Sequence, residues 1–258
     1  MRVNSTIFFT IISFFYSFLL LVVYFTKEKI KTPENRIYSK LIIVNLIGII
    51  LELLCCIFAV VAKDYLTLYT IINKLFLLYL IVWCSIFGVY VFLISSKIED
   101  KKELRKYMNK VICFYLFLDI VFGSLIFYMP VEFEFVNGVV MYSYGPSANI
   151  VYIGSFISIA LMVFCMIKNF KNLRSKKYLP MFVYLVLGTL TTAIQKAIPS
   201  LLMATSMEAF VTCLMYFTIE NPDMKLLKEM HEAKEISDNA NEEKTLFLYN
   251  MTQEIRAT

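Results

Sequence analysis

Seven stretches, each of about 20 mostly apolar residues, constrain the fold of this sequence more than any other feature. They lie at about 5–26, 40–62, 67–95, 110–129, 149–168, 178–198 and 200–219. A helix of this length crosses the hydrocarbon core of a bilayer. Because 59% of the 258 residues are hydrophobic and only 17% are charged, the chain lacks the polar surface of a soluble protein. The sequence therefore predicts an all-α integral membrane protein, folded as a bundle of seven transmembrane helices.

The basic residues between these stretches predict the orientation of the bundle. The first, third and fifth loops contain 16 Lys and Arg residues, whereas the opposite side has three, Arg2, Lys63 and Lys196. Cytoplasmic loops of membrane proteins are enriched in Lys and Arg. We therefore expect the N-terminus outside the cell and the C-terminus in the cytoplasm. Two domains follow, a sensor bundle over 1–219 and a cytoplasmic helix over 220–258.

One outer loop has the pattern of a β-hairpin. Apolar and acidic residues alternate from Val131 to Phe135, as in a strand with one buried face. Asn137-Gly138 follows, a favoured pair for a two-residue turn because both positions need a positive φ. The sequence predicts an extracellular β-hairpin over 131–144 that lies over the mouth of the bundle. The hairpin is either a lid or part of a ligand site, or an ordered loop without a ligand role.

Five ionisable residues within the apolar stretches need an explanation, and these are Glu52, Lys74, Asp119, Lys196 and Glu208. Ionisable groups at bilayer depth are costly and normally face the bundle interior or a water-filled cavity. Their depths allow a shared polar ligand pocket in the outer half of the bundle, in which Lys74 neutralises one of the acids. Alternatively, they form buried structural pairs, with both lysines reaching toward the interface. The six cysteines lie in apolar runs without zinc spacing, so we expect no metal site.

Several function classes are disfavoured by the same residues. The net charge of +5 belongs to loops that flank the membrane, so we expect the lipid bilayer and no nucleic acid as a partner. A retinal-binding photoreceptor needs a lysine in the middle of the last span, and residues 200–219 contain none. A small transporter remains an alternative, although paired helices broken by Gly or Pro at midplane are not found.

A polar segment with one narrow apolar stripe follows the last apolar stretch. Asn221 and Pro222 suit the cap and the first position of a helix. Such a narrow stripe suits a parallel two-stranded coiled coil made by two chains, which can pass rotation or splaying into the cytoplasm. The stripe consists of Leu226, Met230, Ala233, Ile236, Ala240, Phe247, Met251 and Ile255.

The end of this segment resembles the phospho-acceptor helix of bacterial sensor histidine kinases. The motif of that family commonly reads F-L-x-N-M-S-H-E-[IL]-R-x-P, and residues 247–256 read Phe-Leu-Tyr-Asn-Met-Thr-Gln-Glu-Ile-Arg. The resemblance implies a multi-span sensor of a two-component signal transduction system in the plasma membrane of a bacterium. It also implies a homodimer, or a heterodimer with a related kinase, and a response regulator as a possible downstream partner.

Two positions depart from the motif of the family. Gln253 occupies the position of the phospho-acceptor histidine, and Thr258 that of the proline. An amide nitrogen is not a nucleophile, so Glu254 has no imidazole to orient. The only histidine, His231, lies 22 residues upstream of position 253, where it cannot replace the missing one. We therefore expect no catalytic residue and no cofactor here, with ATP and Mg²⁺ used only by a kinase domain downstream. The alternative is a non-enzymatic receptor or adaptor that pairs with an intact kinase.

Overall fold

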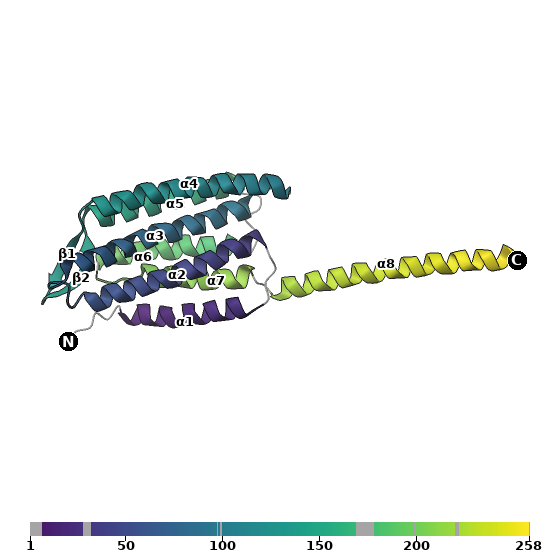
Figure 1. Cartoon of the computed structure of the whole chain (residues 1–258), viewed down its shortest axis with the longest axis horizontal. Coiled ribbons are helices and arrows are strands. Elements are labelled where there is room, and N and C mark those ends of the chain that lie inside the picture. Colours follow the sequence, from purple (N-terminus) through teal and green to yellow (C-terminus); the bar gives the residue numbers. More distant parts are fainter. Residues whose placement is uncertain are drawn as a thin grey trace. The chain divides into compact units, whose positions relative to one another are not determined.

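Long apolar helices make up most of the chain in the computed structural model (Figure 1). The structure describes residues 7–27, 32–96, 98, 100–168, 178–198, 200–219 and 222–257. The chain divides into two compact units, Met1–Thr218 and Ile219–Thr258. Two helices of the first unit, α6 (Leu179–Ala197) and α7 (Ala204–Ile219), are apolar but short. Within the described residues, five helices are long and apolar enough to cross a membrane, namely α1 (Ile7–Thr26), α2 (Pro33–Phe58), α3 (Leu66–Ser95), α4 (Lys101–Tyr128) and α5 (Pro146–Lys168).

Capping residues set the starts of α2 and α4. The Thr32 hydroxyl accepts a hydrogen bond from the backbone N–H of Asn35 at 3.2 Å, and Pro33 fits the first helical position. The Asp100 carboxylate accepts two backbone N–H groups of the first turn of α4, both at 3.3 Å. Both helices therefore begin before the apolar stretches predicted at 40 and 110, and their first turns are polar.

Helix α3 is the central helix of the first unit and packs against α2, α4 and α5. Its Trp83, Phe87 and Val91 side chains are fully buried. By contrast, α4 and α5 turn large apolar side chains outward, such as Phe117, which is 62% exposed, and Phe156, which is 73% exposed. Apolar surface of this extent suits contact with lipid, as expected of membrane-spanning helices.

The two short helices are joined to the long ones by hydrogen bonds. In α7, the Thr212 carbonyl accepts a bond from the Tyr38 hydroxyl of α2 at 2.9 Å. In α6, the Tyr184 hydroxyl lies 3.1 Å from the Cys84 Sγ of α3. Just before α6, the Tyr178 hydroxyl donates to Ser95 of α3 at 3.2 Å. Both short helices therefore lie beside the long ones in the bundle (Figure 1).

A two-stranded antiparallel sheet, β1 (Glu132–Val136) and β2 (Val139–Tyr144), connects α4 to α5. Its turn residues Asn137 and Gly138 have φ angles of 52° and 86°, so the predicted hairpin and its turn are confirmed. The Phe133 ring packs against the Tyr69 ring of α3, with their centroids 4.9 Å apart. The backbone N–H of Val140 donates to the carbonyl of the α2 C-cap residue at 3.2 Å. The hairpin is thus fixed to α2 and α3 at one end of the bundle.

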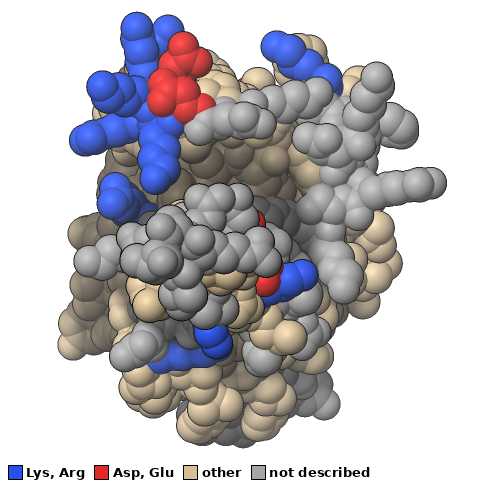
Figure 2. Space-filling view, turned by 90° about the vertical axis from the view of Figure 1, so that its right-hand side faces the viewer, with Lys and Arg blue, Asp and Glu red and all other residues tan. Residues whose placement is uncertain are grey.

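The opposite end of the bundle is basic. Figure 2 looks onto that end, and blue side chains gather in one region of it. The first three turns of α4 contribute five exposed basic residues, Lys101, Lys102, Arg105, Lys106 and Lys110. The connections of the bundle thus place the hairpin at one end and these basic side chains at the other.

The second unit is a single helix, α8 (Pro222–Ala257), of 36 residues. At a rise of about 1.5 Å per residue, α8 is about 54 Å long. It begins at Pro222, the position that the sequence predicts, whereas the expected cap Asn221 lies outside the described residues.

Candidate functional site

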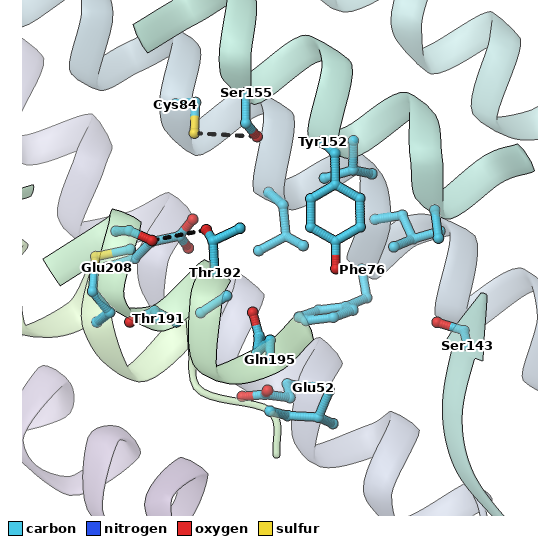
Figure 3. A pocket seen from close by; sticks show the side chains of 18 of the residues that line it. Glu52, Phe76, Cys84, Ser143, Tyr152, Ser155, Thr191, Thr192, Gln195 and Glu208 are labelled. Carbon is cyan, nitrogen blue, oxygen red and sulfur yellow. Dashed lines mark hydrogen bonds between the residues drawn. The ribbon is translucent and has the colours of Figure 1, made fainter. Parts of the chain in front are cut away.

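A cavity of about 190 Å³ lies between the helices at the hairpin end of the bundle. Its wall is formed by residues of α2, α3, α5, α6, α7 and β2. Strand β2 contributes Tyr142 and Ser143, so the hairpin forms part of the wall. Tyr152 of α5 also lines the cavity and is 56% exposed, so the cavity reaches the surface of the chain. Figure 3 shows Glu208 and Thr191 on one side of this space, with Tyr152 and Phe76 on the other.

Glu208 of α7 is buried in this wall and is held by an aromatic hydroxyl. The Tyr79 hydroxyl of α3 lies 2.7 Å from Glu208 Oε2 and 3.2 Å from Asn45 Oδ1, so both oxygens share one donor. The Asn45 amide of α2 donates in turn to the Ser17 hydroxyl of α1 at 3.3 Å. A chain of polar side chains therefore joins α7, α3, α2 and α1 inside the bundle.

The Tyr79 ring reaches Glu208 only because α2 has a glycine where the ring passes. A methyl group on Gly48 would overlap the Tyr79 ring. The absence of a side chain at position 48 therefore lets α2 and α3 approach closely enough for the Tyr79 hydroxyl to bridge Asn45 and Glu208.

Glu52 of α2 is 1% exposed and lines the same cavity as Glu208. Its Oε2 accepts a hydrogen bond from the Thr10 hydroxyl of α1 at 3.0 Å. Within the described part of the chain, neither Glu52 nor Glu208 forms an ion pair. In the same part of the chain, no group of three or more His, Cys, Asp and Glu side chains is placed to ligate a metal ion. Two buried carboxylates without a protein cation can take up protons or bind a cation from outside.

The structure brings together two of the five ionisable candidates, Glu52 and Glu208. One alternative from the sequence was that Lys74 neutralises one of the acids, and in the structure it does not. Its Nζ donates to the carbonyls of Phe127 and Met129, both at 2.8 Å. These carbonyls end α4, where they lack intrahelical donors and where the helix dipole favours a positive charge.

Of the remaining two candidates, Asp119 lies apart from the cavity, and the side chain of Lys196 is not described. Asp119 of α4 accepts a hydrogen bond from the Ser85 hydroxyl of α3 at 2.6 Å and is not among the residues that line the cavity. Lys196 belongs to α6, but its side chain lies outside the described residues.

Three residues of the site were not predicted, namely Tyr79, Tyr184 and Thr191. Thr191 of α6 lines the cavity and is 7% exposed, and its side chain makes no hydrogen bond within the described residues. Tyr184 also lines the cavity, and its ring centroid is 5.4 Å from that of Trp83. A hydroxyl group in an apolar helix needs a hydrogen-bond partner, so a tyrosine or threonine there is the sequence feature that could have indicated these residues. With 17 tyrosines in the sequence, that signal alone does not select the right ones.

The stripe predicted on the cytoplasmic segment lies on α8. Its described members are exposed, and Met230, Ile236, Phe247 and Met251 show 64%, 70%, 61% and 44% of their surface. Ala233 and Ala240 are exposed as well. The side chains of four further predicted residues lie outside the described residues, namely Leu226, Gln253, Glu254 and Ile255.

Comparison of this sequence with models of protein families finds no match, and comparison with curated proteins finds none. The cavity, its two carboxylates and the exposed stripe of α8 are therefore the observations that bear on function.

Proposed function

We propose that the chain is a membrane sensor that binds a ligand in the cavity and relays its occupancy through α7 to α8. The observation that carries this proposal is the position of Glu208, which lines the cavity and lies on α7, the helix before α8 in the sequence. A ligand that binds Glu208 competes with the Tyr79 hydroxyl for its carboxylate. Because a ligand shifts a conformational equilibrium only by its differential affinity for the two states, this competition is the coupling step.

In this proposal the bundle crosses the membrane seven times. The 16 residues of α7 span about 24 Å, less than the roughly 30 Å of the hydrocarbon core. Residues 201–203, which precede α7, are apolar and not helical. Non-helical backbone is tolerated at membrane depth where it lines a cavity, and Leu202 lines this one. The hydrogen bonds that join α6 and α7 to the long helices support two further crossings.

The basic end of the bundle supports its orientation. Lys and Arg accumulate on the cytoplasmic side of membrane proteins, so the exposed basic residues of α4 favour a cytoplasmic position for that end. The hairpin and the cavity then face outward, and α8 is cytoplasmic. The proposed location is the plasma membrane of a bacterium, by the resemblance to sensor histidine kinases.

The proposed output is a change in how two α8 helices pair. The exposed apolar stripe of α8 supports this, because an uncovered stripe on a helix of 36 residues suits a partner helix. Gln253 has an amide where the resemblance calls for an imidazole, so this position passes on a geometric signal and accepts no phosphoryl group. The partner is a second copy or a related kinase with the histidine intact.

Cysteine cross-linking in membranes tests the paired helix. Residues 222–257 contain no cysteine, so Ala240→Cys introduces one thiol on the stripe of α8. Glu242→Cys is the matched control, because residue 242 lies about 200° around the helix from residue 240. We expect a disulfide-linked dimer for Ala240→Cys and much slower linkage for Glu242→Cys. Equal rates for the two variants, or no linkage at position 240, would contradict the pairing of two copies of this chain.

A further inference from the structure

We infer that the ligand of the cavity is a small organic cation, an amine with a short apolar or aromatic part. This inference rests on the proposed sensor function, because it names the ligand class of the same cavity. It is supported by the charge of the cavity, by a polar side chain that lacks a partner, and by the size and composition of the wall.

The charge of the wall favours a cation. Glu52 and Glu208 are 1% and 3% exposed, and each accepts a hydrogen bond from a hydroxyl group, Thr10 for Glu52 at 3.0 Å and Tyr79 for Glu208 at 2.7 Å. Hydroxyl groups stabilise a carboxylate but do not neutralise it. Within the described residues no basic side chain pairs with either acid, and Lys74 is engaged with two backbone carbonyls. An ammonium group in the cavity that both acids line would supply a positive charge for their carboxylates.

An unpartnered hydroxyl in the wall independently indicates a polar ligand. Thr191 is 7% exposed, lines the cavity and makes no hydrogen bond with the described residues. A buried polar group without a partner costs free energy, so native proteins keep few of them. Thr191 lies on the same side of the cavity as Glu208 (Figure 3). A polar head group at this side would satisfy both side chains.

The volume of the cavity and the aromatic residues of its wall limit the size and chemistry of the part of the ligand beyond its charged group. The cavity of about 190 Å³ is somewhat larger than an engineered cavity of about 150 Å³ that binds benzene. It is smaller than the roughly 300–1,000 Å³ of sites for drug-sized molecules. Phe76, Tyr152 and Tyr184 line it, and aromatic faces attract cations as well as apolar groups. A small amine with one aromatic ring meets each of these limits.

Direct binding to the full chain in nanodiscs of zwitterionic lipid tests the inference. The probe is radiolabelled 2-phenylethylamine, and empty nanodiscs correct for partition into lipid. The competitor is 2-phenylethanol, which has nearly the same shape and no charge. We expect the amine to bind about tenfold more tightly than the alcohol, because hydrogen bonds to charged groups are the stronger ones. Equal affinity, tighter binding of the alcohol, or no saturable binding of the amine would overturn the inference.

Charge-removing variants locate the bound amine. Glu52→Gln and Glu208→Gln keep the shape of the side chains, and each should remove a large part of the tenfold preference for the amine. Asp119→Asn is the control, because Asp119 is bonded to Ser85 and does not line the cavity. An unchanged preference in both Glu variants would overturn the inference. Cross-linking of Ala240→Cys uses no ligand, so it tests the pairing of α8 independently of the amine-binding result.

Discussion

The hydroxyl of Tyr79 links α3 to Glu208, the residue of α7 that lines the cavity, and its removal is the sharpest perturbation of the bundle. Tyr79→Phe keeps the ring against Gly48 but removes the donor to Glu208 at 2.7 Å and to Asn45 at 3.2 Å. Both acceptors are buried, with Asn45 at 1% and Glu208 at 3% exposed. Asn45 does not line the cavity, so water cannot easily replace the donor that it loses, and the variant should be less stable.

The size of the loss follows from the partners of the hydroxyl. A hydrogen bond to a neutral group contributes about 0.5–1.5 kcal/mol to stability and one to a charged group about 1.5–3 kcal/mol. Hydrogen bonds between membrane helices average about 0.6 kcal/mol and reach about 1.7 kcal/mol. For Tyr79→Phe we expect a loss of about 1–2 kcal/mol, or roughly 5–30-fold in the unfolding equilibrium constant.

Reversible unfolding in mixed micelles, followed by tryptophan fluorescence, measures this loss. The chain has one tryptophan, Trp83, which is fully buried in α3. Tyr115→Phe is the matched control, because the Tyr115 hydroxyl is buried and has no hydrogen-bond partner within the described residues. Its removal should leave the free energy of unfolding unchanged or raise it. Equal losses in the two variants would refute the argument that Tyr79 holds α7 in place.

Four further substitutions, of which Gly188→Ala is the control for Gly48→Ala, test other parts of the structure. Gly48→Ala should cost about 2–3 kcal/mol in the same unfolding assay, because its methyl group overlaps the Tyr79 ring. Gly188→Ala should cost far less, since its new methyl carbon would lie 3.8 Å from Met207. Thr32→Ala should cost about 1 kcal/mol and speed hydrogen exchange in the first turn of α2, because the capping hydroxyl is lost. Gly138→Ala should cost about 1 kcal/mol at its φ of 86° and increase proteolysis of the hairpin. Unchanged exchange or proteolysis in the last two would contradict these assignments.

The helices and the hairpin could be predicted because their signals are local. Apolar runs mark the helices, and Asn137-Gly138 marks a turn that needs two positive φ values. The starts of α2 and α4 were less well placed, because caps at Thr32 and Asp100 lie in polar sequence outside the apolar runs. The end of α2 at Phe58, rather than near residue 62, follows from the turns before α3.

The site could be predicted only in part, because its geometry depends on how each helix is rotated. The cost of burying charge singled out Glu52 and Glu208, and the structure places both at one cavity. The cost of burying charge also singled out Lys74. Its hydrogen-bond acceptors are backbone carbonyls at the end of α4, and no sequence pattern indicates that these carbonyls lie beside it. Tyr79 could not be predicted for a similar reason, since its role depends on the close approach of α2 and α3 at Gly48.

In the proposed sensor, the bond between Tyr79 and Glu208 couples the cavity to the pairing of α8. The most direct measurement is the cross-linking rate of Ala240→Cys in three membrane-embedded chains, one otherwise unchanged, one with Tyr79→Phe and one with Tyr115→Phe. We expect Tyr79→Phe to change the rate several-fold and Tyr115→Phe to leave it unchanged, because only Tyr79 donates to Glu208 on the helix that precedes α8. The same rate in all three chains would contradict the claim.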